Sequence, residues 1–139
     1  MVSAMHEAWC WYKLKVLIEM TGHRVTALGL SASGTNLKTL GEVRTLYDYT
    51  LPLIELRASL PPNEKVILVG HSLGGMNLAL TMDKYPEKIS VAVFLNAFLP
   101  DTIHKPSYVL DKIEIMKGLS LSIMFVNLLA VISTNLPEV

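Results

Sequence analysis

The stretch KVILVGHSLGGMNLAL, residues 65–80, constrains the fold of this chain more than any other. Its opening residues, KVILV, are almost all β-branched or leucine, as in a strand buried on both faces of a parallel sheet. Glycines follow at positions 70, 74 and 75, and residues 76–85 then have the apolar content of a helix that Pro86 closes. A buried strand that turns directly into a helix is the building unit of parallel α/β sheets.

Other segments extend the same alternation of strands and helices. The sequence predicts helices over residues 11–20 and 48–60 and strands over residues 24–30 and 89–95. The chain is therefore assigned to the α/β class, with a parallel sheet flanked by helices. Ligands of such sheets bind beyond the carboxyl ends of the strands, where residues 70–75 and 96–104 are expected.

The two predicted helices before residue 65 have recognisable faces and ends. Leu14, Leu17 and Ile18 would form the apolar face of the first helix. In the second helix, Thr50 would be the amino-terminal cap, and Pro52 would be tolerated because it falls in the first turn.

Composition excludes several classes of protein. The 139 residues suffice for one domain, and an apolar content of 51% with 17% charged residues argues against disorder. Twelve basic residues balance twelve acidic ones without forming a run, so no nucleic-acid or anionic membrane surface is indicated. Cys10 is the only cysteine, which excludes an internal disulfide and predicts a cytoplasmic protein.

The most apolar stretch, Leu119–Ile132, is shorter than the roughly 20 residues that a membrane span requires, and it contains two serines and an asparagine. It is interpreted as a buried helix, not a membrane anchor. Nothing in the sequence resembles a metal site or a phosphate-binding loop, so no cofactor is expected.

Gly70-His71-Ser72-Leu73-Gly74 has the spacing G-x-S-x-G. Between a strand and a helix, this pattern indicates a nucleophile elbow, in which glycines at 70 and 74 permit close packing and Ser72 takes a strained backbone conformation. The N–H of Leu73, at the positive end of the helix, would face an oxyanion. His71 is expected to pack beside the turn or line the pocket, because neighbouring strand residues point to opposite faces.

Several longer stretches resemble one family. They are WCWYKL (9–14), GHRVTAL (22–28), LYDYTLPL (46–53), VILVGHSLGGMNL (66–78) and AFLPD (97–101). Together they are similar to the plant methylesterase and hydroxynitrile lyase family of α/β hydrolases, which includes salicylate-binding and jasmonate methyl esterases. The resemblance covers residues 8–110 and implies the amino-terminal part of an α/β-hydrolase fold.

The resemblance implies roles for particular residues. Ser72 would be the nucleophile that forms an acyl-enzyme, and the N–H groups of Leu73 and Ala4 would hold the oxyanion. Ala4 lies where the family has a loop that follows its first core strand, and that strand is expected to be missing here. His6 occupies a histidine position of the same loop and would be structural or line the pocket.

The triad acid and histidine of the family lie downstream of the matched region and are expected to be absent. The chain is accordingly divided into a partial hydrolase domain, residues 1–112, and a divergent hydrophobic tail, residues 113–139. Without the tail, strands 24–30 and 89–95 would have open edges. Asp101 and His104 follow a strand that should end near Ser72, but the family has a similar stretch besides its true histidine, so His104 is assigned to the pocket. His23 would lie at the opposite end of the sheet.

Three functions follow from this interpretation. The first is an esterase for small methyl esters, such as methyl salicylate, methyl jasmonate or methyl indole-acetate, impaired by the missing triad partners. The second is a hydroxynitrile lyase, which Ala4 disfavours because such relatives carry threonine there. The third is a non-catalytic truncated remnant or ligand-binding fragment. The resemblance also implies a homodimer.

Overall fold

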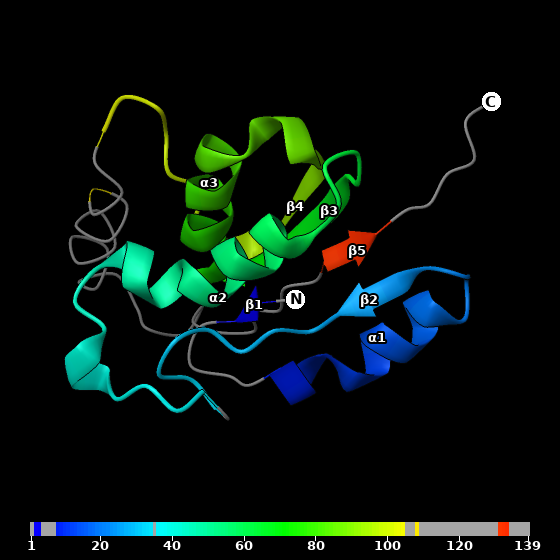
Figure 1. Cartoon of the computed structure of the whole chain (residues 1–139), viewed down its shortest axis with the longest axis horizontal. Coiled ribbons are helices and arrows are strands. Elements are labelled where there is room, and N and C mark those ends of the chain that lie inside the picture. Colours follow the sequence, from blue (N-terminus) through cyan, green and yellow to red (C-terminus); the bar gives the residue numbers. More distant parts are fainter. Residues whose placement is uncertain (1, 4–7, 35, 105–107, 109–130, 134–139) are drawn as a thin grey trace, which may run out of the picture.

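The computed structural model describes residues 2–3, 8–34, 36–104, 108 and 131–133 (Figure 1). In chain order the helices and strands are β1 (Val2–Ser3), α1 (Tyr12–Glu19), β2 (Arg24–Thr26), α2 (Leu46–Ser59), β3 (Val66–Ser72), α3 (Gly74–Lys84), β4 (Ile89–Ala97) and β5 (Val131–Ser133). Short 3₁₀ turns span Ala8–Trp11, Leu40–Glu42 and Pro86–Lys88.

Strand β3 is the centre of the sheet, with paired strands on both edges. On one edge it runs parallel to β4, from Val66 opposite Ile89 to Ser72 opposite Ala97. The other edge is shared, because β1 pairs with it in parallel at Gly70 and His71 and β5 pairs in antiparallel fashion near its start. The α/β class predicted from the sequence is confirmed, although β5 makes the sheet mixed.

Two segments differ from their predicted form. Val2 and Ser3, which the resemblance places in the oxyanion loop just before Ala4, form the two-residue strand β1, and the absence of the family's first core strand before this loop stays a prediction. Strand β2 stops at Thr26, four residues before the predicted end, and Leu30 beyond it is fully buried. The left-handed φ of +53° at Ala32 belongs to the turn that follows.

The hydrophobic tail forms part of the sheet. Residues 131–133 are the strand β5, so the predicted helix over 119–132 is wrong at its last two residues, and the rest of it lies outside the described residues. β5 pairs with β2 along its whole length, from Thr26 opposite Val131 to Arg24 opposite Ser133. Residues 131–133 therefore cover one edge of β2, whose other edge has no partner strand among the described residues.

Strand β4 was predicted to be buried on both faces, and this is wrong. Its far edge has no partner strand among the described residues, and Val91 and Leu95 are 49% and 37% exposed. Beside it lies an open hollow of about 180 Å³ lined by Met82, Pro86, Ile89, Ser90, Val91 and Ala92. An apolar sequence alone predicts a buried strand, but it does not show whether another strand lies beside β4.

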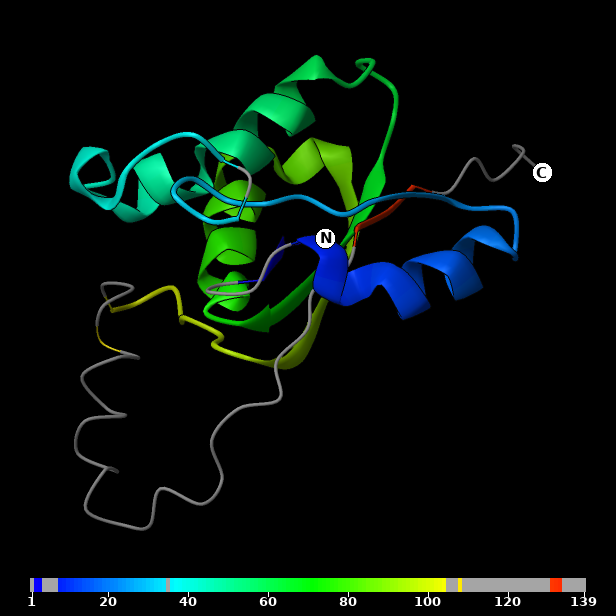
Figure 2. The same cartoon turned by 90° about the horizontal axis from the view of Figure 1, so that it is seen from below.

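The helices lie on both faces of the sheet, with α2 and α3 on one side and α1 on the other (Figure 2). The buried hydrophobic core consists of Trp11, Val25, Leu30, Leu53, Val66, Leu68, Val69 and Leu78. Leu14 and Ile18 of α1 pack against this core as predicted, but Leu17 is 61% exposed. No helix in the described part of the chain is both long and apolar enough to span a membrane.

Helix α2 begins earlier than predicted, because Thr45 is its cap. The Thr45 hydroxyl accepts a hydrogen bond from the Asp48 N–H at 3.0 Å, and the Asp48 carboxylate accepts one from the Thr45 N–H, also at 3.0 Å. Thr50 is instead fully buried inside the helix. Pro52 consequently lies beyond the first turn, where it removes one intrahelical hydrogen bond.

Helix α3 packs unusually close to the end of β4. A Cβ added at Gly75 would stand 2.0 Å from the carbonyl oxygen of Phe98 and 3.0 Å from the Cβ of Ala97. No side chain fits into that space, so Gly75, directly after the G-x-S-x-G motif, permits the close approach of helix and strand.

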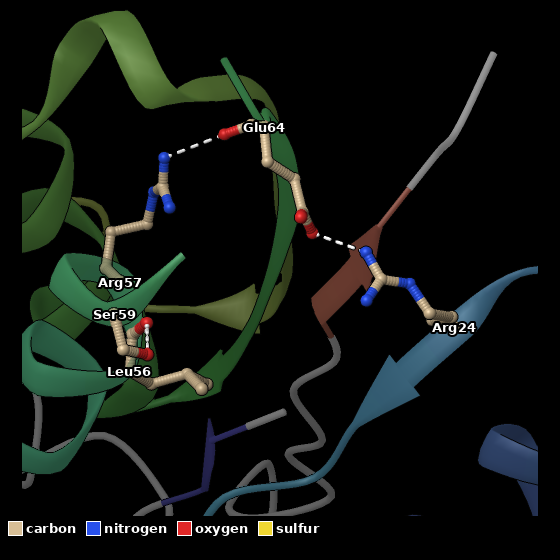
Figure 3. A network of polar contacts seen from close by, with 5 residues as sticks. All are labelled: Arg24, Leu56, Arg57, Ser59 and Glu64. Atoms are coloured by element: carbon tan, nitrogen blue, oxygen red, sulfur yellow. Dashed lines mark hydrogen bonds and ion pairs between the residues drawn. The ribbon is translucent and has the colours of Figure 1, made fainter. Parts of the chain in front are cut away.

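A polar network joins the start of β3 to α2 and β2 (Figure 3). The buried guanidinium of Arg57, in α2, donates to the carbonyl oxygen of Glu64 at 2.9 Å, and the Glu64 carboxylate lies 2.6 Å from the guanidinium of Arg24 in β2. The Nε and Nη1 atoms of Arg57 have no hydrogen-bond partner among the described residues. Burial lowers the pKa of Arg57, so its charge is incompletely compensated.

We expect Gly75→Ala to destabilise the fold by about 1–3 kcal/mol or more, since the new methyl group would have to displace backbone atoms. Gly41→Ala is the matched control, because its Cβ would meet nothing closer than 4.0 Å. The control should be neutral or stabilising by up to about 1 kcal/mol. Urea unfolding of both variants measures this difference, and equal stability would contradict the close contact.

We expect Arg57→Met to leave the free energy of unfolding within about 1 kcal/mol of the parent value or to raise it, because it removes a poorly compensated buried charge and keeps the volume. Arg57→Ala should be about 2–5 kcal/mol less stable than Arg57→Met, since it leaves a cavity. Thermal and urea unfolding compare the two variants. A loss of several kcal/mol in Arg57→Met would show that the charge itself stabilises the fold.

Candidate functional site

Ser72 lies at a sharp turn from β3 into α3. It is the last residue of the strand, Leu73 follows, and the helix begins at Gly74. The φ angle of Ser72 is +59°, in the left-handed region that residues other than glycine rarely adopt. The strained strand-to-helix turn predicted from the G-x-S-x-G spacing is thus present in the structure.

The neighbouring strand deforms at the same level. Asn96 of β4 has a φ of +43°, and the register shifts there so that Ser72 stands opposite Ala97. The N–H of Phe98 then donates to the carbonyl oxygen of Ser72 at 2.9 Å. This bond satisfies the Ser72 carbonyl at the turn and ties it to the end of β4.

A buried side-chain network supports the turn from the helix side. Asn77, fully buried in α3, donates from Nδ2 to the Leu73 carbonyl oxygen at 3.2 Å. Its Oδ1 lies 2.7 Å from the hydroxyl of Thr50 in α2. The position of Leu73 therefore depends on contacts from two helices.

Ser72 and the residue before it differ in how far their side chains are exposed. Its side chain is partly exposed, and its hydroxyl has no hydrogen-bond partner among the described residues. His71, the preceding residue, is only 2% exposed and belongs to the interior of the sheet. Ala4 and His6, expected in the oxyanion loop, lie outside the described residues, although β1 ends just before them beside Gly70 and His71.

Asp101 and His104 form a pair on the loop after β4. Nδ1 of His104 lies 2.7 Å from Oδ2 of Asp101, and the Asp101 carboxylate also accepts the backbone N–H groups of His104 and Ile103. These hydrogen bonds, that of the His104 N–H above all, lower the pKa of Asp101 to about 2. The His104 ring stacks on Tyr108 with 3.9 Å between ring centroids.

The arrangement of this pair bears on its chemistry. An imidazole whose Nδ1 is held by a carboxylate keeps Nε2 for proton transfer, as a general base requires. However, both side chains are nearly half exposed, and the His104 backbone N–H and ring Nδ1 are both hydrogen-bonded to Asp101. His23 precedes β2, which runs parallel to β3, and therefore lies at the opposite end of the sheet from Ser72.

Some of the residues that position the site have no signature in the sequence. Asn77 and Asn96 carry no motif signal, since their roles depend on contacts with other elements. The cap at Thr45 was visible, because T-x-x-D before an apolar run is a helix-start signature. A second such box joins Thr39 and Glu42, whose carboxylate accepts the Thr39 N–H at 2.7 Å.

We expect the Asp101 carboxyl to titrate with a pKa of about 2 in the parent chain. In His104→Ala the pKa should rise but stay below the ordinary value, because the backbone N–H of residue 104 remains. A lowered pKa in the folded state stabilises the loop above the ordinary carboxyl pKa, and this stability is lost as the pH falls toward 2. Carbon-detected NMR titration measures both values. Ile103→Ala, which keeps every donor, should leave the pKa unchanged, and a shift there would contradict the assignment.

The chain matches known proteins over most of its length. Residues 5–121 match a family described as the alpha/beta hydrolase fold. Over 110 residues it is 65% identical to salicylic acid-binding protein 2 of Nicotiana tabacum, with 79% of this chain and 42% of that protein covered. Methylesterase 1 of Arabidopsis thaliana is 60% identical over 111 residues, with 79% and 42% covered. The alpha-hydroxynitrile lyase of the same plant is 59% identical over 116 residues, with 84% and 45% covered.

A solved structure agrees with these relatives. The crystal structure of polyneuridine aldehyde esterase superimposes with a TM-score of 0.80 at 49% identity, covering 89% of this chain and 48% of that one. The chain thus spans less than half the length of each protein it matches here. The resemblance to plant methylesterases and hydroxynitrile lyases that the sequence indicated is confirmed, and the chain belongs to the alpha/beta hydrolase fold family.

Proposed function

We propose that this chain carries the nucleophile part of a serine carboxylesterase for small methyl esters. The observation that supports the proposal most is the left-handed φ of +59° at Ser72, placed between a buried strand and the amino end of α3. A serine held in this way exposes its hydroxyl at the carboxyl edge of the sheet, where ligands of α/β proteins bind. The relationship to methylesterase 1 supports the methyl ester as the substrate class.

The proposed first step is attack by Oγ of Ser72 on the ester carbonyl carbon. The negative charge that develops on the carbonyl oxygen would be held by the N–H of Leu73, with that of Ala4 as a second donor. Collapse of this intermediate breaks the bond to the methoxy oxygen, which takes up the proton removed from Ser72 and leaves as methanol, and the acyl group stays on Ser72. Water then attacks the acyl group and releases the free acid, which regenerates the serine.

Both steps need a base that accepts the serine or water proton. In serine hydrolases the loss of that base lowers turnover on the order of 10⁶-fold, while the oxyanion hole and substrate binding retain roughly 10³–10⁴-fold over water. The His104 imidazole is hydrogen-bonded to Asp101, and the resemblance puts the family's triad histidine downstream of the matched region. We therefore propose that this chain binds methyl esters but turns them over very slowly.

Other parts of the proposal concern the protein as a whole. A homodimer and a cytoplasmic location are proposed from the family resemblance and the single cysteine. His71, His6 and His104 are proposed as pocket residues. No cofactor is assigned.

We expect a fluorophosphonate probe to label the parent chain slowly and at one residue, Ser72, and we expect turnover of methyl salicylate, methyl jasmonate and methyl indole-acetate on the order of 10⁶-fold below that of full-length methylesterase 1. Ser72→Ala should abolish the labelling. Ser59→Ala is the matched control, because Ser59 only donates to the Leu56 carbonyl at an exposed helix end. Mass spectrometry of the labelled peptide and methanol release measure the two quantities.

Several outcomes would change the proposal. Turnover within about 10³-fold of methylesterase 1 that disappears in Ser72→Ala would show that a base exists in this chain, and His104→Ala would then test the Asp101–His104 pair. Cyanide release from a cyanohydrin without ester hydrolysis would favour a hydroxynitrile lyase. A chain that is folded but neither labels nor binds esters would be non-catalytic.

A further inference from the structure

Strand β2 and the start of β3 do not pair with each other, because β5 lies between them. Ile132 stands opposite Val25 on one side and Ile67 on the other, and Ser133 stands opposite Arg24 and Val66. Neighbouring strands lie about 4.8 Å apart, so β2 and β3 are separated by roughly twice that spacing. Within the described residues, β5 alone joins β2 to the rest of the sheet.

The space that β5 fills is bounded by strands on both sides and by other residues at both ends. Its sides are two strands with buried residues, Val25 at 7% exposure and Val66 at 2%. At one end, the ion pair between Arg24 and Glu64 reaches from β2 to the start of β3 across β5, as Figure 3 shows. Toward the other end, β1 occupies the same edge of β3 from Gly70 onward. The space between these boundaries is wide enough for one strand and is short along the strand direction.

The occupant is suited to this position by its backbone and its lack of charge. No charged residue occurs from 119 to 133, and Val131 and Ile132 are β-branched residues that favour strands. The contacts are backbone hydrogen bonds between paired strands. When a strand adds to the edge of a sheet, these backbone bonds supply the affinity. Such bonds are identical whether the strand comes from the same molecule or from another copy, so exchange between copies requires no new interface.

We propose that the space between β2 and the start of β3 is a strand-binding site, and that residues 131–133 enter it both in their own molecule and in a second copy of this chain. The tail then acts as a separable strand, and exchange of tails links two copies into a dimer. This assignment is independent of any activity at Ser72.

A disulfide cross-link tests the register and the exchange in the full chain. In a Cys10→Ser background, Arg24→Cys and Ser133→Cys place two thiols on directly opposed residues, within the Cα separation that a disulfide needs. The control pairs Arg24→Cys with Val131→Cys, two residues out of register and about 7 Å farther along the strand. Oxidation is followed by non-reducing electrophoresis over a hundredfold range of protein concentration.

We expect the in-register pair to cross-link at least about tenfold faster than the control, with linked dimers replacing linked monomers as the concentration rises. Equal rates in the two pairs would overturn the register. Linked monomers alone at every concentration would overturn the exchange between copies. Both pairs leave the buried core intact, so a folding failure is not expected to obscure the result.

Backbone exchange provides a second test. Ile132→Pro removes a ladder donor from a strand that is paired on both sides, whereas Leu37→Pro alters a residue that is 98% exposed and outside any strand. We expect Ile132→Pro to speed amide exchange at residues 24–26 on the order of tenfold or more and to spare the β3–β4 ladder. A synthetic peptide of residues 127–137 should restore the protection. Unchanged exchange in Ile132→Pro, or no effect of the peptide, would contradict a separable strand.

Discussion

The backbone pairing of β3 on both of its edges is the constraint on which the rest of the structure depends. On one edge β4 follows it from end to end, and on the other β1 and β5 divide its length between them. Every described strand connects to β3 directly or, for β2, through β5. Because the central strand cannot shift without breaking all of these ladders, the place where it ends is fixed, and Ser72 is at that end.

The strained turn at Ser72 is held from several directions. A non-glycine residue with a left-handed φ costs on the order of 1–3 kcal/mol, so such a conformation persists only where its surroundings leave no alternative. Here the Phe98 N–H binds the Ser72 carbonyl, and Asn77 binds that of Leu73. Because Gly75 has no side chain, α3 packs closely against the backbone of Phe98. The turn is preorganised by backbone geometry rather than by the hydroxyl it presents.

The sequence predicted the parts of this structure that depend on local chemistry. The strand-turn-helix unit around Ser72 follows from its apolar run and its glycines, and the parallel pairing with β4 follows from the alternation of elements. The exposure of Val91 could not be predicted, because it depends on which segment lies beside the strand and not on the strand itself. Around Val131 the long apolar run suggested a helix, and the β-branched side chains of Val131 and Ile132, which favour strands, were too short a signal to outweigh it.

For the candidate site, the motif gave Ser72 and Leu73 but not the residues that hold them. Asn77 and Thr50 lie on two different helices and are 27 positions apart in the chain, so no spacing rule reveals the contact. The start of α2 was missed for a different reason, since Pro52 directed attention to a first turn beginning too late. Contacts distant in sequence are thus where prediction from one sequence ends.

The position of β5 has a consequence for how the protein is made. Residues 24–26 and 66–67 are synthesised well before residues 131–133, yet the described pairing of residues 24–26, and of one edge of residues 66–67, depends on them. At roughly 5–20 residues per second, the nascent chain spends several seconds or longer with the middle of its sheet unfilled. During that interval one edge of β3 can pair with β4, while the start of its other edge still lacks β5. The pairing of β2 with the rest of the sheet is therefore completed after the pairing of β3 with β4 can form.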